Sequence, residues 1–314
     1  MVAYGDLIVS ILATSLPLTM PILYASIGEV FAERSGVLNM GIEGIMSLSA
    51  FVSLLVAFST GSYLFGLFAG IAAAVAMGVL HSFVSVRIGI NQLIAGLMMY
   101  FLALYLGDFC YVIATKSSYL HILPISPVHI PILSSLPVVG PILFSQNILV
   151  YASFAVAVVA GLVLYRTTWG LKIRAVGENP EASDSAGINV NLVRHLCVIF
   201  GAALAGVGGA SLVLGYLGLY ATGDTLMAGR GWIAIVVVIF ARWSPYKAIA
   251  GAWLFGLGYS IAAIFIGSGL FSSLGTASGY FLLAIPYIFA IVFMLVFHRG
   301  TKAPSSLTVP YKRK

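Results

Sequence analysis

The stretch RSGVLNMGIEGIMSLSAF, residues 34–51, places a single carboxylate, Glu43, at the start of an apolar run. Charge is scarce throughout the chain, because charged residues make up 8% of its 314 residues and hydrophobic residues make up 61%. An ordinary soluble domain carries about 25% charged residues. The composition therefore predicts an all-α polytopic membrane protein, in which a charge at the mouth of an apolar run needs an explanation of its own.

Apolar runs recur at the length that a membrane-spanning helix needs, which is about 20 residues for a core of about 30 Å. The segment 231–241 would span only about 16 Å, so it is expected to be a broken helix that borrows residues from 215–230, or a re-entrant piece. We expect about 8–10 transmembrane helices in one domain, 1–314. The approximate spans are 7–27, 40–58, 64–86, 88–113, 147–165, 194–214, 231–241, 248–266 and 279–297.

The basic residues indicate the orientation. With the N-terminus outside, 13 of the 15 lysines and arginines fall on the cytoplasmic side, and Lys116 and Arg230 fall outside. Cytoplasmic loops of membrane proteins carry such an excess. The segment 114–146, with five prolines, is then an irregular external loop. The basic tail, 299–314, is expected to be a disordered cytoplasmic end near anionic lipid headgroups.

Two short motifs suggest an internal repeat. LNMGIEGI (38–45) and LMAGRGWI (226–233) share Leu, Gly and Ile at identical offsets. In the proposed orientation the first motif enters a span from the cytoplasm and the second enters one from outside, as an inverted repeat requires. The repeat would place Glu43 in one half and Arg230 in the other, at similar positions around a central pathway.

Polar side chains at and beside the two motifs are the candidates to line that pathway: Asn39, Glu43, Asp224 and Arg230. A charge at mid-membrane costs about 2.5 to 3.5 kcal/mol on insertion scales, so Glu43 should face protein or a cavity. The alternative is that Glu43 lies at the cytoplasmic headgroup level near a helix N-terminus, where the helix dipole favours a carboxylate.

Three further candidates for the pathway have structural alternatives. Asn91 and Gln92 interrupt the apolar stretch GINQLIAGLMMY (89–100). Buried amides need hydrogen-bond partners, which a polar solute in the pathway would supply. Helix capping or interhelical bonding near the inner membrane face is the alternative. Trp232 can stack on a flat face of a solute, or belong to an aromatic belt at the membrane interface.

The longest polar stretch between spans, 166–193, contains one short predicted helix in ENPEASDSAG (178–187). Asn179 is its N-cap, Pro180 its first position, and Gly187 its stop. A helix of about 10 Å hardly forms alone in water, because nucleation is costly. We interpret it as an element that docks in a groove on another protein; the alternative is a surface turn with helix-compatible residues.

Motifs for catalysis and metal binding are absent. The chain has no GxxxxGK[ST] phosphate loop, no HExxH, no CxxC and no GxSxG, and its five histidines are dispersed. We therefore expect no catalytic residue, no metal site and no cofactor in this chain. Its basic residues form no patch interleaved with aromatics, so no nucleic-acid partner is expected either.

Three blocks, GEVFAERSGVLNMGIEGIM, WGLKIRAVGENPEASDSAGINV and MAGRGWIAIVVVIFARWSP, resemble the permease subunits of ABC importers in the ribose and branched-chain amino acid superfamily. Within it they are most similar to the smaller permease of nucleoside or simple-sugar systems. The similarity extends over about residues 17–297, nearly the whole chain.

The resemblance implies a multi-pass subunit in the cytoplasmic membrane of a bacterium or archaeon. It implies three partners: a second homologous permease, a cytoplasmic ATPase that binds ATP and magnesium, and an external substrate-binding lipoprotein or periplasmic protein. By the same resemblance, 166–193 is the loop that couples to the ATPase. The implied coupling residues are Glu178, Asn179, Pro180, Glu181, Asp184 and Gly187.

The sequence thus favours import of nucleosides or related small polar solutes by alternating access, driven by ATP. A permease for a simple sugar is the close alternative. In a different class, an ion-coupled secondary transporter would use Glu43 or Asp108 as its titrating group, but the docking loop would then have no role.

Overall fold

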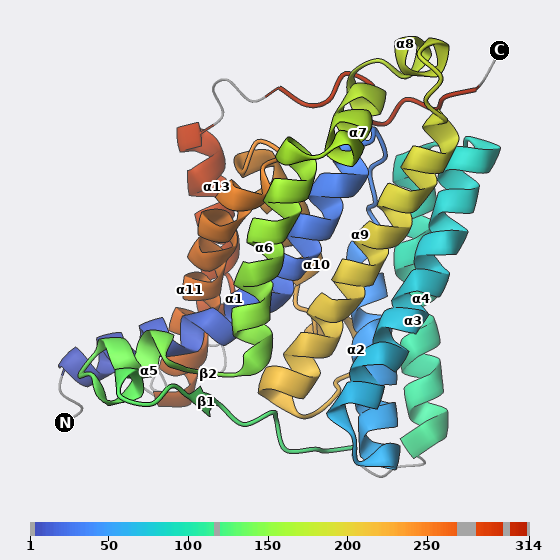
Figure 1. Cartoon of the computed structure of the whole chain (residues 1–314). Coiled ribbons are helices and arrows are strands. Elements are labelled where there is room, and N and C mark those ends of the chain that lie inside the picture. Colours follow the sequence, from blue (N-terminus) through green and yellow to red (C-terminus); the bar gives the residue numbers. More distant parts are fainter. Residues whose placement is uncertain (1–3, 116–119, 269–280, 298–301, 313–314) are drawn as a thin grey trace.

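A computed structural model describes residues 4–115, 120–268, 281–297 and 302–312 (Figure 1). Within these residues, seven helices are long and apolar enough to cross a membrane, and Arg230–Phe240 and Phe281–Val292 are shorter apolar helices. This confirms the prediction of an all-α polytopic membrane protein. In chain order the helices are α1 (Tyr4–Arg34), α2 (Ile42–Thr60), α3 (Tyr63–Ser82), η1 (Phe83–Ile88), α4 (Gln92–Thr115), η2 (Leu133–Ser135), α5 (Val139–Leu143), α6 (Ile148–Arg166), α7 (Thr168–Glu178), α8 (Pro180–Ser185), α9 (Val190–Leu212), η3 (Val213–Leu217), η4 (Gly223–Thr225), α10 (Arg230–Phe240), α11 (Pro245–Ser268) and α13 (Ile285–Phe297).

The segment between α4 and α6 is irregular, as its prolines predict. Its described residues, 120–147, contain two short helical pieces, η2 and α5, and two short strands. The strands β1 (Val128–His129) and β2 (Ser145–Gln146) pair antiparallel. In Figure 1 this segment crosses one end of the helix bundle.

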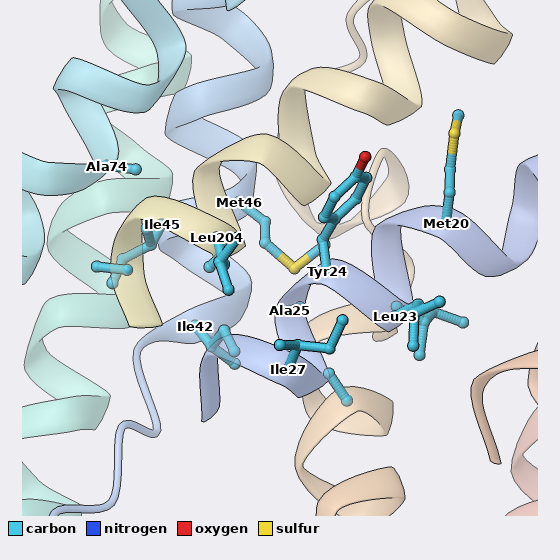
Figure 2. Packing of buried hydrophobic residues seen from close by; sticks show 14 of the residues in the cluster. Met20, Leu23, Tyr24, Ala25, Ile27, Ile42, Ile45, Met46, Ala74 and Leu204 are labelled. Atoms are coloured by element: carbon cyan, nitrogen blue, oxygen red, sulfur yellow. The ribbon is translucent and has the colours of Figure 1, made fainter. Parts of the chain in front are cut away.

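Helix α1 lies at the centre of the bundle and packs against α6, α9, α10 and α11. It approaches α9 closely at a pair of glycines: a Cβ on Gly28 would lie 2.5 Å from the carbonyl oxygen of Gly201. Small residues allow such contact between membrane helices. Figure 2 shows part of the hydrophobic core, to which four helices contribute: Met20, Leu23, Tyr24, Ala25 and Ile27 of α1, Ile42, Ile45 and Met46 of α2, Ala74 of α3 and Leu204 of α9.

Two prolines, Pro17 and Pro21, lie inside α1. Proline has no N–H, so Pro17 leaves the carbonyl of Ala13 without its usual helical donor. The side chain of Gln146, at the end of β2, supplies one: its Nε2 donates to Ala13 O at 3.1 Å. A proline inside a membrane helix is tolerated when a neighbouring group satisfies the freed carbonyl in this way.

The short segment 231–241 forms a short helix, α10, of 11 residues. It does not continue a longer helix, because four residues of the preceding segment, 218–229, have positive φ. Arg230 and Gly231, at its first two positions, are buried. The helix therefore begins inside the protein, as expected for a broken or re-entrant piece.

Helices α2 and α10 begin side by side and end on opposite sides of the molecule. Beyond the far end of α10, the carbonyl of Trp243 accepts a hydrogen bond from Arg34 at the end of α1, at 3.2 Å. Beyond the far end of α2, the hydroxyl of Tyr63 donates to Leu123 O, at 2.7 Å, in the irregular segment. In Figure 1 these two places lie at opposite ends of the bundle. An inverted repeat requires this arrangement, although the repeat itself stays a prediction.

The tail was expected to be disordered, which is wrong for residues 302–312. Ser306 is 5% exposed, and its N–H donates to the carbonyl of Gly177 at 2.9 Å. The physical reason is a buried cation, Arg194 of α9, whose guanidinium donates to this segment. A buried guanidinium needs acceptors, and the backbone and serines of the tail provide them.

Candidate functional site

The starts of α2 and α10 meet at Glu43. Each helix begins after a glycine, Gly41 or Gly229, and neither has a capping side chain of its own. Glu43 is 1% exposed, and its Oε1 accepts the N–H of Gly229 at 2.7 Å while its Oε2 accepts the N–H of Gly231. The carboxylate thus satisfies two free N–H groups at the positive end of the α10 dipole. The structure therefore joins the two sequence motifs directly.

Arg230 is the cation beside this carboxylate and is 8% exposed. Its Nη1 donates to the carbonyls of Leu226 and Met227, at 3.3 and 2.9 Å. Its guanidinium carbon lies 4.1 Å from the ring centroid of Tyr259. Its Nε has no hydrogen-bond partner among the described residues. An unused donor on a buried cation is costly, so this group can favour an incoming acceptor.

The turn before α10 is held by two tyrosines. Ala228 has a φ of 45°, which is uncommon for a residue with a side chain. Its carbonyl accepts hydrogen bonds from the hydroxyls of Tyr259, at 2.6 Å, and Tyr287, at 2.7 Å. These tyrosines come from α11 and α13. Together with Glu43 of α2, they fix the start of α10 from three elements.

Two aspartates connect α4 to the segment 218–229. Asp108 accepts the hydroxyl of Tyr220 at 3.0 Å and the N–H of Gly223 at 2.9 Å. Asp224 accepts the hydroxyl of Tyr100. Ser47 of α2 lies 3.2 Å from the Tyr220 hydroxyl. Together with Glu43 and Arg230, these groups form a polar seam between α2, α4 and 218–231.

A cavity of about 680 Å³ lies next to this seam and is lined by Tyr111, Leu120, His121, Leu219, Tyr220, Ala221, Thr222 and Thr225. The rings of Tyr111 and Tyr220 lie with their centroids 5.0 Å apart. Aromatic faces with nearby hydroxyls suit a flat, polar solute. The cavity is formed partly by the irregular segment, which the basic residues predict to be external.

The predicted pathway residues divide into two groups in the structure. Glu43, Asp224 and Arg230 belong to the polar seam. Trp232 borders it, since its ring centroid lies 5.5 Å from that of Tyr100, which also binds Asp224.

The three amides make other contacts. Asn39 accepts the N–H of Gly41 at 3.0 Å and so shapes the turn before α2. Asn91 caps α4, because its Oδ1 accepts the N–H of Leu93 at 3.0 Å. Gln92 accepts the N–H of Leu38 at 2.8 Å. These contacts match the structural alternatives for Asn91 and Gln92, and a pathway role for the three amides stays a prediction.

The predicted docking helix is present as α8. Asn179 accepts the N–H of Ala182 at 2.9 Å as N-cap, Pro180 is the first helical residue, and Gly187 follows the helix with a φ of 81°. Glu178 accepts hydrogen bonds from Ser305. The side chain of Glu181 is exposed. Their coupling role, with that of Asp184, stays a prediction.

Neither α7, which precedes α8, nor the buried acids Glu29 and Glu33 of α1 are predicted from the sequence. Glu29 accepts the N–H of Asn39 at 2.8 Å, and Glu33 accepts the indole N–H of Trp243. Both acids are 1% exposed. Their spacing of four residues, which puts them on one helix face, was the available signal.

The fold and the seam define a class of protein: a multi-pass α-helical membrane protein with a broken helix and a polar interior, as transport proteins have. The chain belongs to the family described as branched-chain amino acid transport system / permease component, whose model matches residues 11–298. It is therefore a permease component, and a protein of the cell membrane.

Known relatives agree with this family. The chain is 33% identical to the nucleoside ABC transporter permease protein NupC of Lactococcus lactis, over 96% of both chains. It is 32% identical to the guanosine ABC transporter permease protein NupQ of Bacillus subtilis, over 97% of this chain and 98% of that one. It is 38% identical to a putative glucose ABC transporter permease protein, TsgC13, of Haloferax volcanii, over 75% of this chain and 71% of that one. No solved structure gives a significant match.

Proposed function

We propose that this chain imports nucleosides or related small polar solutes, as one of two permease subunits of an ATP-driven transporter. The observation that carries the proposal is the similarity over nearly the whole chain to permeases named for nucleosides and guanosine. The polar seam beside a cavity with aromatic walls supports a solute of this kind. A simple sugar is the second candidate, because a relative named for glucose is 38% identical.

The proposed partners are a second homologous permease, a cytoplasmic ATPase that binds ATP and magnesium, and an external substrate-binding protein. The second permease is supported by the relatives, because Bacillus subtilis and Lactococcus lactis each have another permease, NupP and NupB, that also matches this chain. The ATPase is supported by α8, a six-residue helix that projects beyond the bundle in Figure 1. So short a helix suits a groove on another protein.

In the proposed mechanism, ATP-driven closure of the ATPase displaces α8 and rocks the two halves of the permease. In the described structure the seam is closed by the contacts of Glu43 with α10 and of Asp108 with Gly223. Alternating access requires these contacts to separate. Arg230, with its unused Nε, would then offer a donor to a hydroxyl or carbonyl of the solute.

The energy source is tested by reconstituting the permease pair with its ATPase and binding protein in vesicles. Uptake should require ATP hydrolysis, and collapse of the proton gradient should leave the initial rate unchanged. Gradient-driven uptake by the permease chains alone would contradict the proposal and favour the ion-coupled class.

The docking helix is tested by charge reversal. Glu181→Lys with Asp184→Lys should weaken capture of the ATPase in a detergent pull-down. A matched control is Asp6→Lys, an exposed acid in the first turn of α1. Capture that is unchanged by the α8 pair, or lost equally in the control, would contradict the docking assignment.

The solute is tested with the external binding protein, because that subunit is expected to select it. Nucleosides and simple sugars compete for the purified binding protein in a calorimetric titration. Binding of a nucleoside supports the first candidate, and binding of glucose alone supports the second.

A further inference from the structure

The C-terminal strap, which we define as residues 302–312, contacts the segment that leads into α8. The N–H of Ser306 donates to the carbonyl of Gly177 at 2.9 Å, and its hydroxyl donates to the same carbonyl at 2.7 Å. The hydroxyl of Ser305 donates to Glu178 Oε2 at 2.9 Å. The strap therefore holds the last turn of α7, directly before α8.

Arg194 of α9 joins the strap to α1. It is 2% exposed and among the largest fully buried side chains. Its three guanidinium nitrogens bind two segments: Nε donates to Ser35 O at 3.1 Å, directly after α1, and Nη1 and Nη2 donate to Val309 O at 3.0 Å and Ser306 Oγ at 3.1 Å in the strap. Because a buried guanidinium is costly without acceptors, these three bonds hold their partners together.

Two glycines allow the ends of α1 and α7 and the strap to approach one another closely. A Cβ on Gly177 would clash with the carbonyl oxygen of Arg34, so the end of α7 lies against the end of α1. A Cβ on Gly36, whose φ is 94°, would lie 2.5 Å from the hydroxyl of Ser306. The ends of α1 and α7, the start of α9 and the strap thus form one junction.

From this junction, hydrogen bonds lead to the polar seam. The carbonyl of Gly36 and the N–H of Leu38 both bind the side chain of Gln92, at 3.4 and 2.8 Å. The N–H of Asn39 donates to Glu29, and its side chain accepts the N–H of Gly41. Two residues later, Glu43 closes on α10. Hydrogen bonds therefore fix the segment 35–43 along most of its length, from the strap to the seam.

We propose that Arg194 and the strap are positioning elements of the energy-coupling step. They lock α7 and α8 to the ends of α1 and α9, so that a displacement of α8 moves the segment 35–43 and separates Glu43 from α10. The inference rests on the proposed function, because it assigns α8 to the ATPase. It requires the strap to transmit force, and not to form the ATPase-binding surface.

The experiment compares variants that weaken the junction in the reconstituted transporter. Ser306→Ala removes the buried hydroxyl that binds Gly177 and Arg194. A second variant ends the chain after residue 301. The matched control is Val309→Ala, because that side chain is 53% exposed and its carbonyl bond to Arg194 remains. Each variant is measured for ATPase capture, ATP hydrolysis and solute imported per ATP hydrolysed.

We expect Ser306→Ala and the truncation to lower the solute imported per ATP by about fivefold or more, the lower end of typical coupling between sites, with ATPase capture unchanged. Val309→Ala should behave as the wild type. Unchanged import per ATP in both junction variants would overturn the inference. Loss of ATPase capture in step with loss of import would also overturn it, because the strap would then be part of the docking surface.

A second measurement keeps the inference testable if Ser306→Ala or the truncated chain folds poorly. Hydrogen exchange of the segment 35–43 is followed in the wild-type transporter and in Ser305→Ala, which loses only the exposed bond to Glu178. Binding of a non-hydrolysable ATP analogue should change exchange of 35–43 in the wild type and change it less in the variant. Equal changes would overturn the inference. Failure of the proposed function is seen separately, as wild-type permease that does not capture the ATPase.

Discussion

Glu43 supplies from a neighbouring element the cap that α10 lacks. It accepts two N–H groups, those of the partly buried Gly229 and the buried Gly231, that have no acceptor in their own helix. The cost of its burial is offset by those two bonds and by the helix dipole. Glu43 is therefore a structural element of the closed seam as well as a candidate for the pathway.

Replacement of Glu43 should show how much the cap contributes. Glu43→Ala leaves the buried N–H of Gly231 and the partly buried N–H of Gly229 without their acceptor, at a cost of up to about 1–3 kcal/mol each in the free energy of unfolding. Glu43→Gln keeps one acceptor oxygen and should cost about half as much. Denaturation of the purified permease measures both, with Asp6→Asn, in an exposed position, as control. Equal stability of Glu43→Ala and wild type would contradict the cap.

Gly231 makes a second prediction at this scale. A Cβ at this position would lie 2.6 Å from the Cα of Glu43, where backbone has to shift. Gly231→Ala should therefore lower stability by about 1–3 kcal/mol and reduce uptake. Gly267→Ala is the control, since nothing lies within 4 Å of a Cβ there. If both alanine variants unfold at the same temperature as the wild type, the close approach of α2 and α10 is wrong.

At the scale of elements, α1 depends on a residue far away in the sequence. Pro17 frees the carbonyl of Ala13, and Gln146 satisfies it. Gln146 also donates to Ile142 O at 2.9 Å, so it ties the irregular segment to the first helix. The proline position inside α1 is thus stabilised by an element about 130 residues later in the chain.

A double-mutant cycle tests this dependence. Gln146→Ala should lower the free energy of unfolding by about 1–3 kcal/mol, because it leaves the partly buried Ala13 O without a donor. In the background of Pro17→Ala, residue 17 regains its N–H and can bind that carbonyl. Gln146→Ala should then cost less, with the remainder due to its bonds to the irregular segment. Equal costs in both backgrounds would show that Gln146 and Pro17 act independently.

At the scale of the whole molecule, the cavity and the junction lie toward opposite ends of the bundle (Figure 1). The cavity beside Tyr220 opens near the irregular segment, and the strap lies near α7 and α8. With the basic residues inside, the proposed mechanism has solute enter at the cavity and the ATPase act on α8, which the strap connects to the bundle.

This orientation predicts the labelling of single cysteines. With Cys110 and Cys197 replaced by alanine, Thr222→Cys in the wall of the cavity should react with a membrane-impermeant maleimide added to intact cells. Ala303→Cys, exposed on the strap, should react only after the cells are opened. The reverse pattern would invert the topology and exclude α8 as a docking element for a cytoplasmic ATPase.

Much of this architecture was predictable from the sequence, because the signals are local. Apolar length predicted the helices, proline content predicted the irregular segment, and Asn179, Pro180 and Gly187 predicted α8 almost to its ends. The tail was misjudged because composition does not show a partner. Ser306 is ordered by Arg194, which stands more than 100 residues earlier.

The candidate site was predictable only in part. The two motifs pointed to Glu43, Asp224 and Arg230, which the seam contains. Asn91 and Gln92 could not be assigned in advance, because a buried amide looks the same in a sequence whether it binds a solute or a helix end.

By itself, the sequence determined the membrane-spanning class, the shortness of α10, the position of the short helix α8 and the family, because these follow from composition, helix length and short motifs. Only the tertiary structure decided that Glu43 caps α10, that Gln146 satisfies the carbonyl that Pro17 frees in α1, and that Arg194 binds the strap. The physical reason is that a buried polar group must find a partner, and the fold, not the neighbouring residues in the chain, determines which partner is within reach.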